Sequence, residues 1–127
     1  MDPAATLSEI RQIAITVSDV ATALPFYRDV LGLEFLFSPS PALAFLAAGS
    51  IRIMLSTPQG AGTVGQNSIL YFKVTEIAAT HAAIVARGAH GEREPQLAAK
   101  MPDHDLWISF VRDPDGNLIG LMEEKRE

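Results

Sequence analysis

Residues 15–21, Ile-Thr-Val-Ser-Asp-Val-Ala, align without a gap on residues 72–78, Phe-Lys-Val-Thr-Glu-Ile-Ala. In each copy the first residues end a stretch of alternating side chains, which is typical of a strand covered on one face. The last residues begin a stretch with helical spacing, after a polar residue suited to capping a helix. The same transition from strand to helix therefore occurs twice, which indicates two copies of one structural unit.

The first unit extends outward from the first copy of this repeat. We expect a strand over residues 10–17 and a helix over residues 20–31, kinked at Pro25 because proline lacks the helical N–H. Gly32 suits the left-handed position that ends a helix. Further strands are expected at residues 33–37, 43–47 and 51–56, with Pro39 and Pro41 breaking the first connection and Gly49-Ser50 turning the second.

The second unit follows the same order. A strand over residues 69–74 and a helix over residues 77–87 precede strands around residues 91–95, 106–112 and 117–123, and Asp113-Pro-Asp-Gly116 is a strong turn signal. Residues 95–105 form a long connection, which leaves a lid, a dimer contact or a mobile segment as alternatives. The whole arrangement predicts an α+β fold in a single domain, residues 1–127, with unit one at about 8–58, a linker at about 59–67 and unit two at about 68–125.

Composition excludes several classes of function. The 127 residues contain no cysteine, so disulfides, thiolate nucleophiles and sulfur-ligated metals are excluded, and a reducing cytoplasm is expected. A formal net charge of −5 argues against nucleic acid and anionic membranes as partners. The N-terminal residues show no signal peptide, and no apolar stretch is long enough to span a bilayer.

Two longer motifs carry a family resemblance. Residues 10–20, Ile-Arg-Gln-Ile-Ala-Ile-Thr-Val-Ser-Asp-Val, with Phe26-Tyr27 and Val30-Leu-Gly-Leu33, resemble the opening of a vicinal oxygen chelate domain, the superfamily of glyoxalases, bleomycin-resistance proteins and extradiol dioxygenases. Residues 110–119, Phe-Val-Arg-Asp-Pro-Asp-Gly-Asn-Leu-Ile, are similar to its closing hairpin. The resemblance covers nearly the whole chain and implies two tandem βαβββ modules that form a cup-shaped mixed sheet, with helices outside and the ligand inside. It also implies a homodimer, with swapped modules or side-by-side chains as open alternatives.

The resemblance also locates the four metal ligands of metal-using relatives, which correspond here to Gln12, Met54, Ile69 and Gly120. Some relatives use glutamine at the first position, so Gln12 alone is compatible with a ligand. Met54 is a poor ligand for hard cations, and Ile69 and Gly120 offer no donor atom. Gly120 also stands where glyoxalase chemistry places a carboxylate base, so we expect no metal, no cofactor and no glyoxalase I activity.

The alternation of each strand separates a helix-facing set of residues from a set that lines the cup. The cup-lining residues expected to bind a ligand are Gln12, Arg52, Met54, Tyr71, Lys73, Trp107 and Met122. Two cations, Arg52 and Lys73, suit an anionic or oxygen-rich ligand, although both side chains alternatively reach solvent. Tyr71 and Trp107 suit stacking on a planar ligand, with helix-side core as the alternative for Trp107. Met54 and Met122 are expected to fill the volume of the missing metal.

Other signals have simpler interpretations. His81 is expected to lie on the outer helix and His90 in a loop after it. His104 lies between two aspartates and is interpreted as part of a solvated loop, with a metal or base site at the cup rim as the alternative. Residues 60–65 match G-x-G-x-x-G, but a strand is expected after them instead of a helix, so they are interpreted as a linker.

These residues support three functional hypotheses. The first is a metal-independent protein that binds and sequesters a planar or anionic small molecule. The second is an enzyme, a lyase, isomerase or dioxygenase, with a non-standard site that uses Tyr71, Lys73 or His104. The third is a non-catalytic interaction module with a collapsed cup. The sequence does not identify the ligand, and fold alone does not decide among the three.

Overall fold

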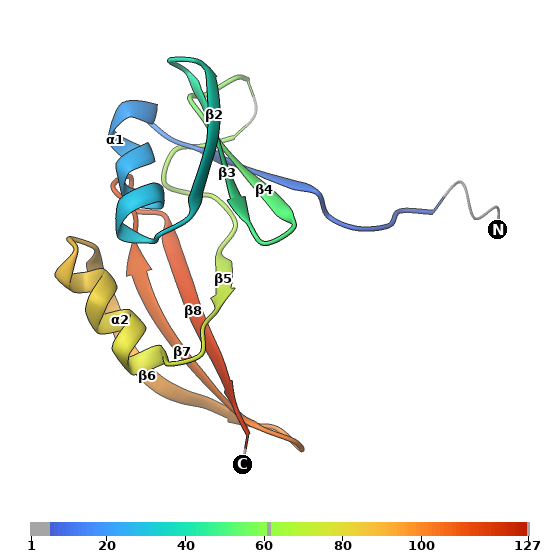
Figure 1. Cartoon of the computed structure of the whole chain (residues 1–127), viewed down its shortest axis with the longest axis vertical. Coiled ribbons are helices and arrows are strands. Elements are labelled where there is room, and N and C mark those ends of the chain that lie inside the picture. The colour runs from blue at the N-terminus through green and yellow to red at the C-terminus, as the bar shows by residue number, and fades with distance from the viewer. Residues whose placement is uncertain (1–5, 61, 127) are drawn as a thin grey trace.

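The computed structural model describes residues 6–60 and 62–126, which form two similar modules (Figure 1). Module one contains five regular elements and one π-helical turn: β1 Gln12–Thr16, α1 Val20–Pro25, the turn η2 Phe26–Val30, β2 Glu34–Ser40, β3 Leu43–Ala48 and β4 Ile51–Ser56. Module two contains β5 Leu70–Lys73, α2 Ile77–Ala86, β6 His90–Lys100, β7 Asp105–Arg112 and β8 Leu118–Lys125. The predicted α+β fold of two βαβββ units is confirmed.

Each module has its own four-stranded sheet with the same topology. The strand orders are β1-β4-β3-β2 and β5-β8-β7-β6. The first strand of each module runs parallel to the last, and the remaining pairs are antiparallel. Within the described residues, β1 and β5 are therefore both edge strands, and the two sheets are not hydrogen-bonded to each other. The two modules follow one another along an arc that is open on the side away from the helices (Figure 1).

The helices cover one face of each sheet, as the alternating strands predict. Ile15, Ile53 and Leu55 are at most 2% exposed beneath α1. The other predicted helix-facing residues also belong to the core or are packed against it: Ile13, Val17, Ile51, Leu70, Phe72 and Val74. The opposite face of each sheet, called the open face here, carries no helix. This separation leaves one side of each sheet free for a ligand or partner.

Prolines shape module one differently from the sequence-based expectation. At Pro25 the α-helix does not simply kink but continues as the π-helical turn Phe26–Val30. The predicted strand break at Pro39 is wrong, because β2 runs through it to Ser40. β2 is an edge strand whose pairing with β3 shifts register on both sides of Phe37, so a residue without an N–H is tolerated there. Edge position thus overrides the usual effect of proline.

The long connection expected over residues 95–105 is also wrong. β6 does not end near Pro95 but pairs with β7 as far as Lys100, opposite Asp105. Only residues 101–104 connect the two strands, and the Met101 N–H donates to the His104 carbonyl in a tight turn. Register shifts along β6 absorb Pro95 within the strand. The segment is therefore part of a long hairpin.

The closing turn of the sequence joins the two modules through a buried carboxylate. Asp113, which is 5% exposed, accepts a hydrogen bond of 2.7 Å from the Tyr27 hydroxyl of module one. Asn117 donates to the same carboxylate through its side chain at 2.8 Å and its backbone at 2.8 Å. Burial and then the Asp113 carboxylate raise the pKa of Tyr27 well above its usual range, because both disfavour the charged phenolate.

The linker is held by the same cluster. The Asn67 side chain donates to Asn117 Oδ1 at 2.9 Å and to the Thr16 carbonyl at 3.1 Å, and accepts from the Thr16 N–H at 3.1 Å. Gly62 has a φ of +97° and lies so close to Thr16 that an added Cβ would clash with the threonine hydroxyl. The G-x-G-x-x-G stretch leads into β5, which fits the linker interpretation. Asn67 thus connects β1 to the Asp113 turn.

No helix in the described part of the chain is long and apolar enough to cross a membrane.

Replacing Tyr27 with phenylalanine tests this connection. The Tyr27→Phe variant leaves a buried carboxylate without one of its donors, so we expect a loss of about 1–3 kcal/mol in the free energy of unfolding, measured by urea denaturation. Ser18→Ala is the matched control, because the exposed Ser18 hydroxyl donates to the half-buried Asp115 carboxylate of the same turn, and its loss is expected to cost less than about 1 kcal/mol. Equal losses in the two variants would contradict the stated role of Tyr27.

Candidate functional site

The open face of module one positions a cation beside aromatic rings. The Arg52 Nε donates to Gln12 Oε1 at 2.7 Å, and the guanidinium lies 5.2 Å from the centroid of the Phe45 ring. Phe45 stacks on Phe37 with centroids 4.8 Å apart and an interplanar angle of 24°. Strands β1, β4, β3 and β2 therefore each contribute one residue to a continuous row, which holds Arg52 in place.

Arg52 has unused binding capacity. Its side chain is exposed, and within residues 6–60 and 62–126 no carboxylate forms an ion pair with it. The Nε bond to Gln12 leaves the outer nitrogens of the guanidinium for a further acceptor. Phe37, which stacks on Phe45 in the same row, is 48% exposed. A planar anion is the ligand chemistry that this combination suits best.

The open face of module two carries a second aromatic pair. Tyr71 meets Phe110 edge to face, with centroids 5.8 Å apart and an interplanar angle of 71°. Both residues flank Gly120, since Tyr71 pairs with Gly120 across β5 and β8 and Phe110 pairs with it across β7 and β8. A Cβ at Gly120 would lie only 2.6 Å from the Tyr71 ring. The tyrosine ring therefore occupies the space that a side chain at position 120 would need.

At one pair of equivalent positions, the two modules have a large and a small residue on opposite strands. The repeat makes Ala14 equivalent to Tyr71, and strand pairing makes Met54, opposite Ala14, equivalent to Gly120, opposite Tyr71. Module one thus has the small residue on its first strand and the large one on its last strand, and module two has the reverse. In both modules the pair lies on the open face beside the free edge, across the first and last strands.

The four positions of a family-type metal site do not offer a set of donors for a divalent cation. The Gln12 oxygen already accepts from Arg52, and its amide nitrogen lies 3.8 Å from the Met54 sulfur. Ile69 has no donor atom, and Gly120 lies under the Tyr71 ring. Across the described residues, no group of three or more histidines and carboxylates is placed to hold a metal ion. Such ions require nitrogen or carboxylate oxygen at this kind of site.

Lys73 and Met122 lie on the open face of module two, directly paired across β5 and β8. Lys73 is exposed and Met122 is half-buried. Arg93, opposite Phe110, adds another cation to this face. In the described chain neither Lys73 nor Arg93 forms an ion pair. A chain with a net charge of −5 therefore places Arg52, Lys73 and Arg93 unpaired on its open faces.

Trp107 does not line the open face. It pairs with Glu123 and lies two residues from Ser109, which bonds to α2, so it shares the helix-facing side of β7. Its ring packs against the core and lies 4.5 Å from the Lys125 ammonium. The expectation that it lines the cup is wrong, and helix-side core, the alternative, describes its position. The residues that sequence reasoning missed are Phe37, Phe45, Phe110 and Arg93, whose face follows from strand pairing and not from local sequence.

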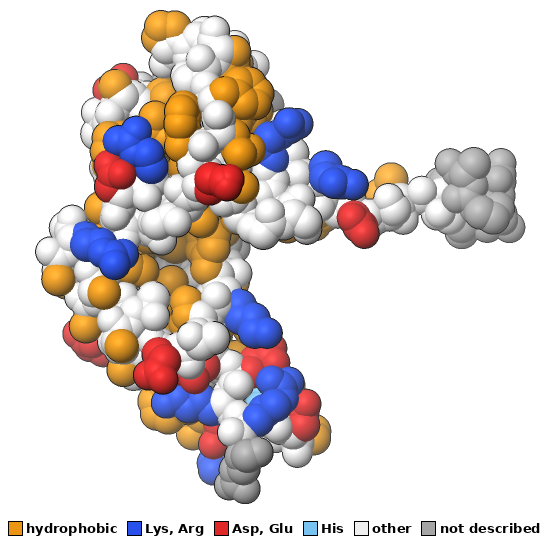
Figure 2. Space-filling model, viewed as in Figure 1, with side chains coloured by type: hydrophobic (Ala, Val, Ile, Leu, Met, Phe, Trp, Pro, Cys, Tyr) orange, Lys and Arg blue, Asp and Glu red, His pale blue; other side chains and the backbone are white. Residues whose placement is uncertain are grey.

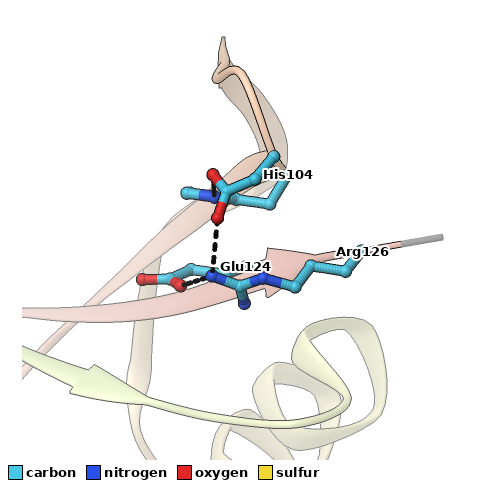
Figure 3. A network of polar contacts seen from close by, with 4 residues as sticks. His104, Glu124 and Arg126 are labelled. Carbon is cyan, nitrogen blue, oxygen red and sulfur yellow. Dashed lines mark hydrogen bonds and ion pairs between the residues drawn. The ribbon is translucent and has the colours of Figure 1, made fainter.

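The three histidines lie away from the Arg52 row. His81 is 3% exposed between α2 and β7, where its Nδ1 lies 3.0 Å from the Ser109 hydroxyl. His90 begins β6 and is exposed. His104 lies in the β6–β7 turn, and its Nδ1 is 2.7 Å from Asp103 (Figure 3). The turn is exposed at residues 101–103, as expected for a solvated loop, while the His104 side chain itself is only 12% exposed.

A charged network ties His104 to the C-terminal strand. Arg126 contacts Asp103 at 3.3 Å and Glu124 at 2.9 Å (Figure 3). The hydrogen bond from His104, followed by Arg126, lowers the pKa of Asp103 below its usual range. All four groups have partners within the network. Asp103 and His104 thus connect the β6–β7 turn to the end of β8.

A protein-family model described as the Glyoxalase/Bleomycin resistance protein/Dioxygenase superfamily matches residues 9–121. The match spans both modules, the Arg52 row and the Tyr71–Gly120 pair. The chain belongs to this superfamily. The vicinal oxygen chelate resemblance of the sequence is thereby confirmed.

Several proteins are similar in sequence or in fold to nearly the whole chain. An uncharacterized protein from Bacillus subtilis (strain 168), YraH, is 27% identical and the match covers 91% of this chain and 98% of that protein. A lactoylglutathione lyase from Agrobacterium tumefaciens is 26% identical, with a TM-score of 0.74 and coverage of 92% and 94%. TnmS3, an antibiotic binding protein from Streptomyces sp. CB03234, is 21% identical, with a TM-score of 0.74 and coverage of 94% and 98%, which shows the fold alone.

A double-mutant cycle tests the steric relation between Tyr71 and Gly120. Gly120→Ala is expected to cost about 1–3 kcal/mol of stability in urea denaturation, because its Cβ displaces the Tyr71 ring. In a Tyr71→Ala background the same substitution should cost less than about 0.5 kcal/mol, since the ring is gone. An equal cost in both backgrounds would show that the two positions act independently.

Proposed function

We propose that this protein binds a planar, anionic small molecule on its open face without a metal ion or other cofactor. The observation that carries the proposal is Arg52, an exposed cation that Gln12 orients beside the stacked rings of Phe45 and Phe37. A ligand carboxylate on the guanidinium would place an attached ring next to these aromatic side chains. Sequestration of such a ligand, and not its chemical conversion, is the proposed role.

The residues at the positions that hold the metal in metal-using relatives support a metal-independent role. Bidentate chelation by a metal needs open coordination positions and several hard donors. Here the equivalent positions carry Met54 and the Tyr71 ring over Gly120, which are suited to apolar contacts. The ancestral metal site is therefore proposed to be lost, with its volume given to ligand contact. TnmS3, which has the same fold, is an antibiotic binding protein, and this is consistent with small-molecule binding on this fold.

A homodimer is proposed to complete the cup. β1 and β5 are free edges within the described chain, and Ile69 and Tyr71 beside the second edge are 42% and 47% exposed. Free edges with apolar neighbours are normally covered. A two-fold pair that places β1 of one copy beside β5 of the other covers both edges twice and brings the Arg52 row to the Tyr71 pair of the second copy. The absence of cysteine suits a reducing cytoplasm as the proposed location.

Calorimetric titration with aromatic carboxylates tests the binding proposal. A thermal-shift screen of aromatic carboxylates first selects the tightest binder, and the uncharged primary amide of the same compound serves as the ligand control. We expect the carboxylate to bind at least about 10-fold more tightly than its amide, because only the carboxylate pairs with Arg52. Arg52→Ala is expected to remove that preference.

Arg28→Ala is the matched protein control, because Arg28 is an exposed arginine that pairs with Asp29 on the helix side. Its affinity for the carboxylate is expected to equal that of the unchanged protein. A carboxylate preference that survives Arg52→Ala, or the absence of any binder in the screen, would contradict the proposal.

A further inference from the structure

The open face of module one carries hydroxyl groups beyond the aromatic rings. Strand pairing places Ser56 opposite Thr16 on one side and opposite Leu43 on the other, and it places Leu43 opposite Ser40. Ser56 lies four residues beyond Arg52 on β4, which corresponds to about 13 Å along the strand. These paired residues with their three hydroxyls, called the hydroxyl row here, therefore share a face with the Arg52 row but lie at the other end of the strands.

The hydroxyl row lines a hollow with a volume of about 510 Å³. Within the described chain no charged side chain lines this hollow, and its apolar residues are alanine, leucine and methionine. Met54 lines the hollow and pairs with Phe45 of the Arg52 row, so the hollow begins where the aromatic rings end. This end of module one includes the β2–β3 turn, where Figure 2 shows hydrophobic and uncharged surface. The polar residues of the wall are Thr16, Ser40, Ser56, Thr57 and Gln59.

The serines of the hydroxyl row keep hydrogen-bonding capacity of both kinds. The Ser40 hydroxyl accepts from the Ala42 N–H at 3.2 Å, so its own O–H is left to donate. The Ser56 hydroxyl donates to the Thr57 carbonyl at 2.8 Å, so its lone pairs are left to accept. A carboxylate only accepts and an ammonium only donates, whereas a hydroxyl group does both. The two serines therefore match a neutral ligand group that carries hydroxyls.

Module two shows that the fold does not require hydroxyls at these positions. The repeat makes Lys73 equivalent to Thr16. The same four places, in a sheet of the same topology, carry no hydroxyl in module two. The hydroxyl row is therefore a property of module one and not of the fold. Strand pairing from Lys73 leads to the equivalents of Ser56, Leu43 and Ser40, which are Met122, Ile108 and Gln96.

We propose that the hollow binds a neutral polyhydroxyl group, of the kind found in a sugar ring, on the same ligand whose carboxylate lies on Arg52. The planar part of this ligand lies along Phe45 and Met54, between the cation and the hydroxyl row. The ligand class is thereby narrowed to an aromatic carboxylate with a polyhydroxylated substituent opposite the carboxylate. The inference rests on the proposed function and adds a specificity-determining site to it. It requires module one of a single chain and does not depend on the dimer.

Calorimetric titration with two matched carboxylates tests the hollow. The probes are para-carboxyphenyl glucoside and para-cyclohexyloxybenzoate, which share the carboxylate and the aromatic ring and differ in the hydroxyls of the substituent. We expect the glucoside to bind at least about 10-fold more tightly, because it adds two hydrogen bonds. A Ser40→Ala, Ser56→Ala double variant is expected to lose this preference. Thr22→Ala, which removes an exposed hydroxyl from α1 on the helix side, is the matched control and is expected to keep it.

A third probe, para-methoxybenzoate, has no group that reaches the hydroxyl row, so it reports on the Arg52 site alone and on the folding of each variant. Its affinity is expected to be the same in the unchanged protein and in both variants. Two results would overturn the inference and leave the carboxylate proposal standing: equal binding of the glucoside and the cyclohexyl ether by the unchanged protein, or a glucoside preference that survives in the double variant. Failure of all three carboxylates to bind the unchanged protein would overturn both proposals.

Discussion

The buried carboxylate of Asp113 is the interaction on which the arrangement of the two modules depends. It accepts the Tyr27 hydroxyl from module one and the Asn117 side chain from its own turn. A carboxylate that is 5% exposed is stabilised only while its donors stay in place, so the contact resists changes in the angle between the modules. Asn67 extends this constraint to β1 through Thr16. These hydrogen bonds connect the two modules, while the edge strands β1 and β5 do not pair with each other within the described chain.

This constraint explains why the open faces have an unusual composition. Separated edges leave the open face beside β1 and β5 uncovered within one chain, and in each module one large and one small residue lie there. In module one the large residue, Met54, is on the last strand and the small one, Ala14, on the first. In module two the large residue, Tyr71, is on the first strand and the small one, Gly120, on the last. Neither pair carries a histidine or a carboxylate, and each open face has a cation, Arg52 in module one and Arg93 in module two. Under the proposed function, stacking and charge take the place of metal coordination.

Local sequence was sufficient for the architecture and for most of the faces. The repeat at residues 15–21 and 72–78 predicted two units, and strand alternation assigned Ile13, Ile15 and Val17 to the helix side. Local sequence failed to predict strand ends and residue faces where contacts between distant parts of the chain determine them. Pro39 and Pro95 do not end their strands, because β2 and β6 are edge strands with shifted pairing. Trp107 was assigned to the wrong face, and Phe37 and Phe45 were missed. Their faces depend on cross-strand register, which local alternation does not determine. The tyrosine ring over Gly120 follows from no pattern in the sequence.

Metal content tests the central claim most directly. Protein purified without an affinity tag would be measured by plasma mass spectrometry and then titrated calorimetrically with Ni²⁺, Zn²⁺, Mn²⁺ and Fe²⁺. A site whose family positions carry Gln12, Met54, Ile69 and Gly120 predicts less than stoichiometric metal and no heat of specific binding for any of the four ions. One tightly bound ion per chain, lost on Gln12→Ala substitution, would contradict the proposed metal-free site and restore a catalytic role as the leading explanation.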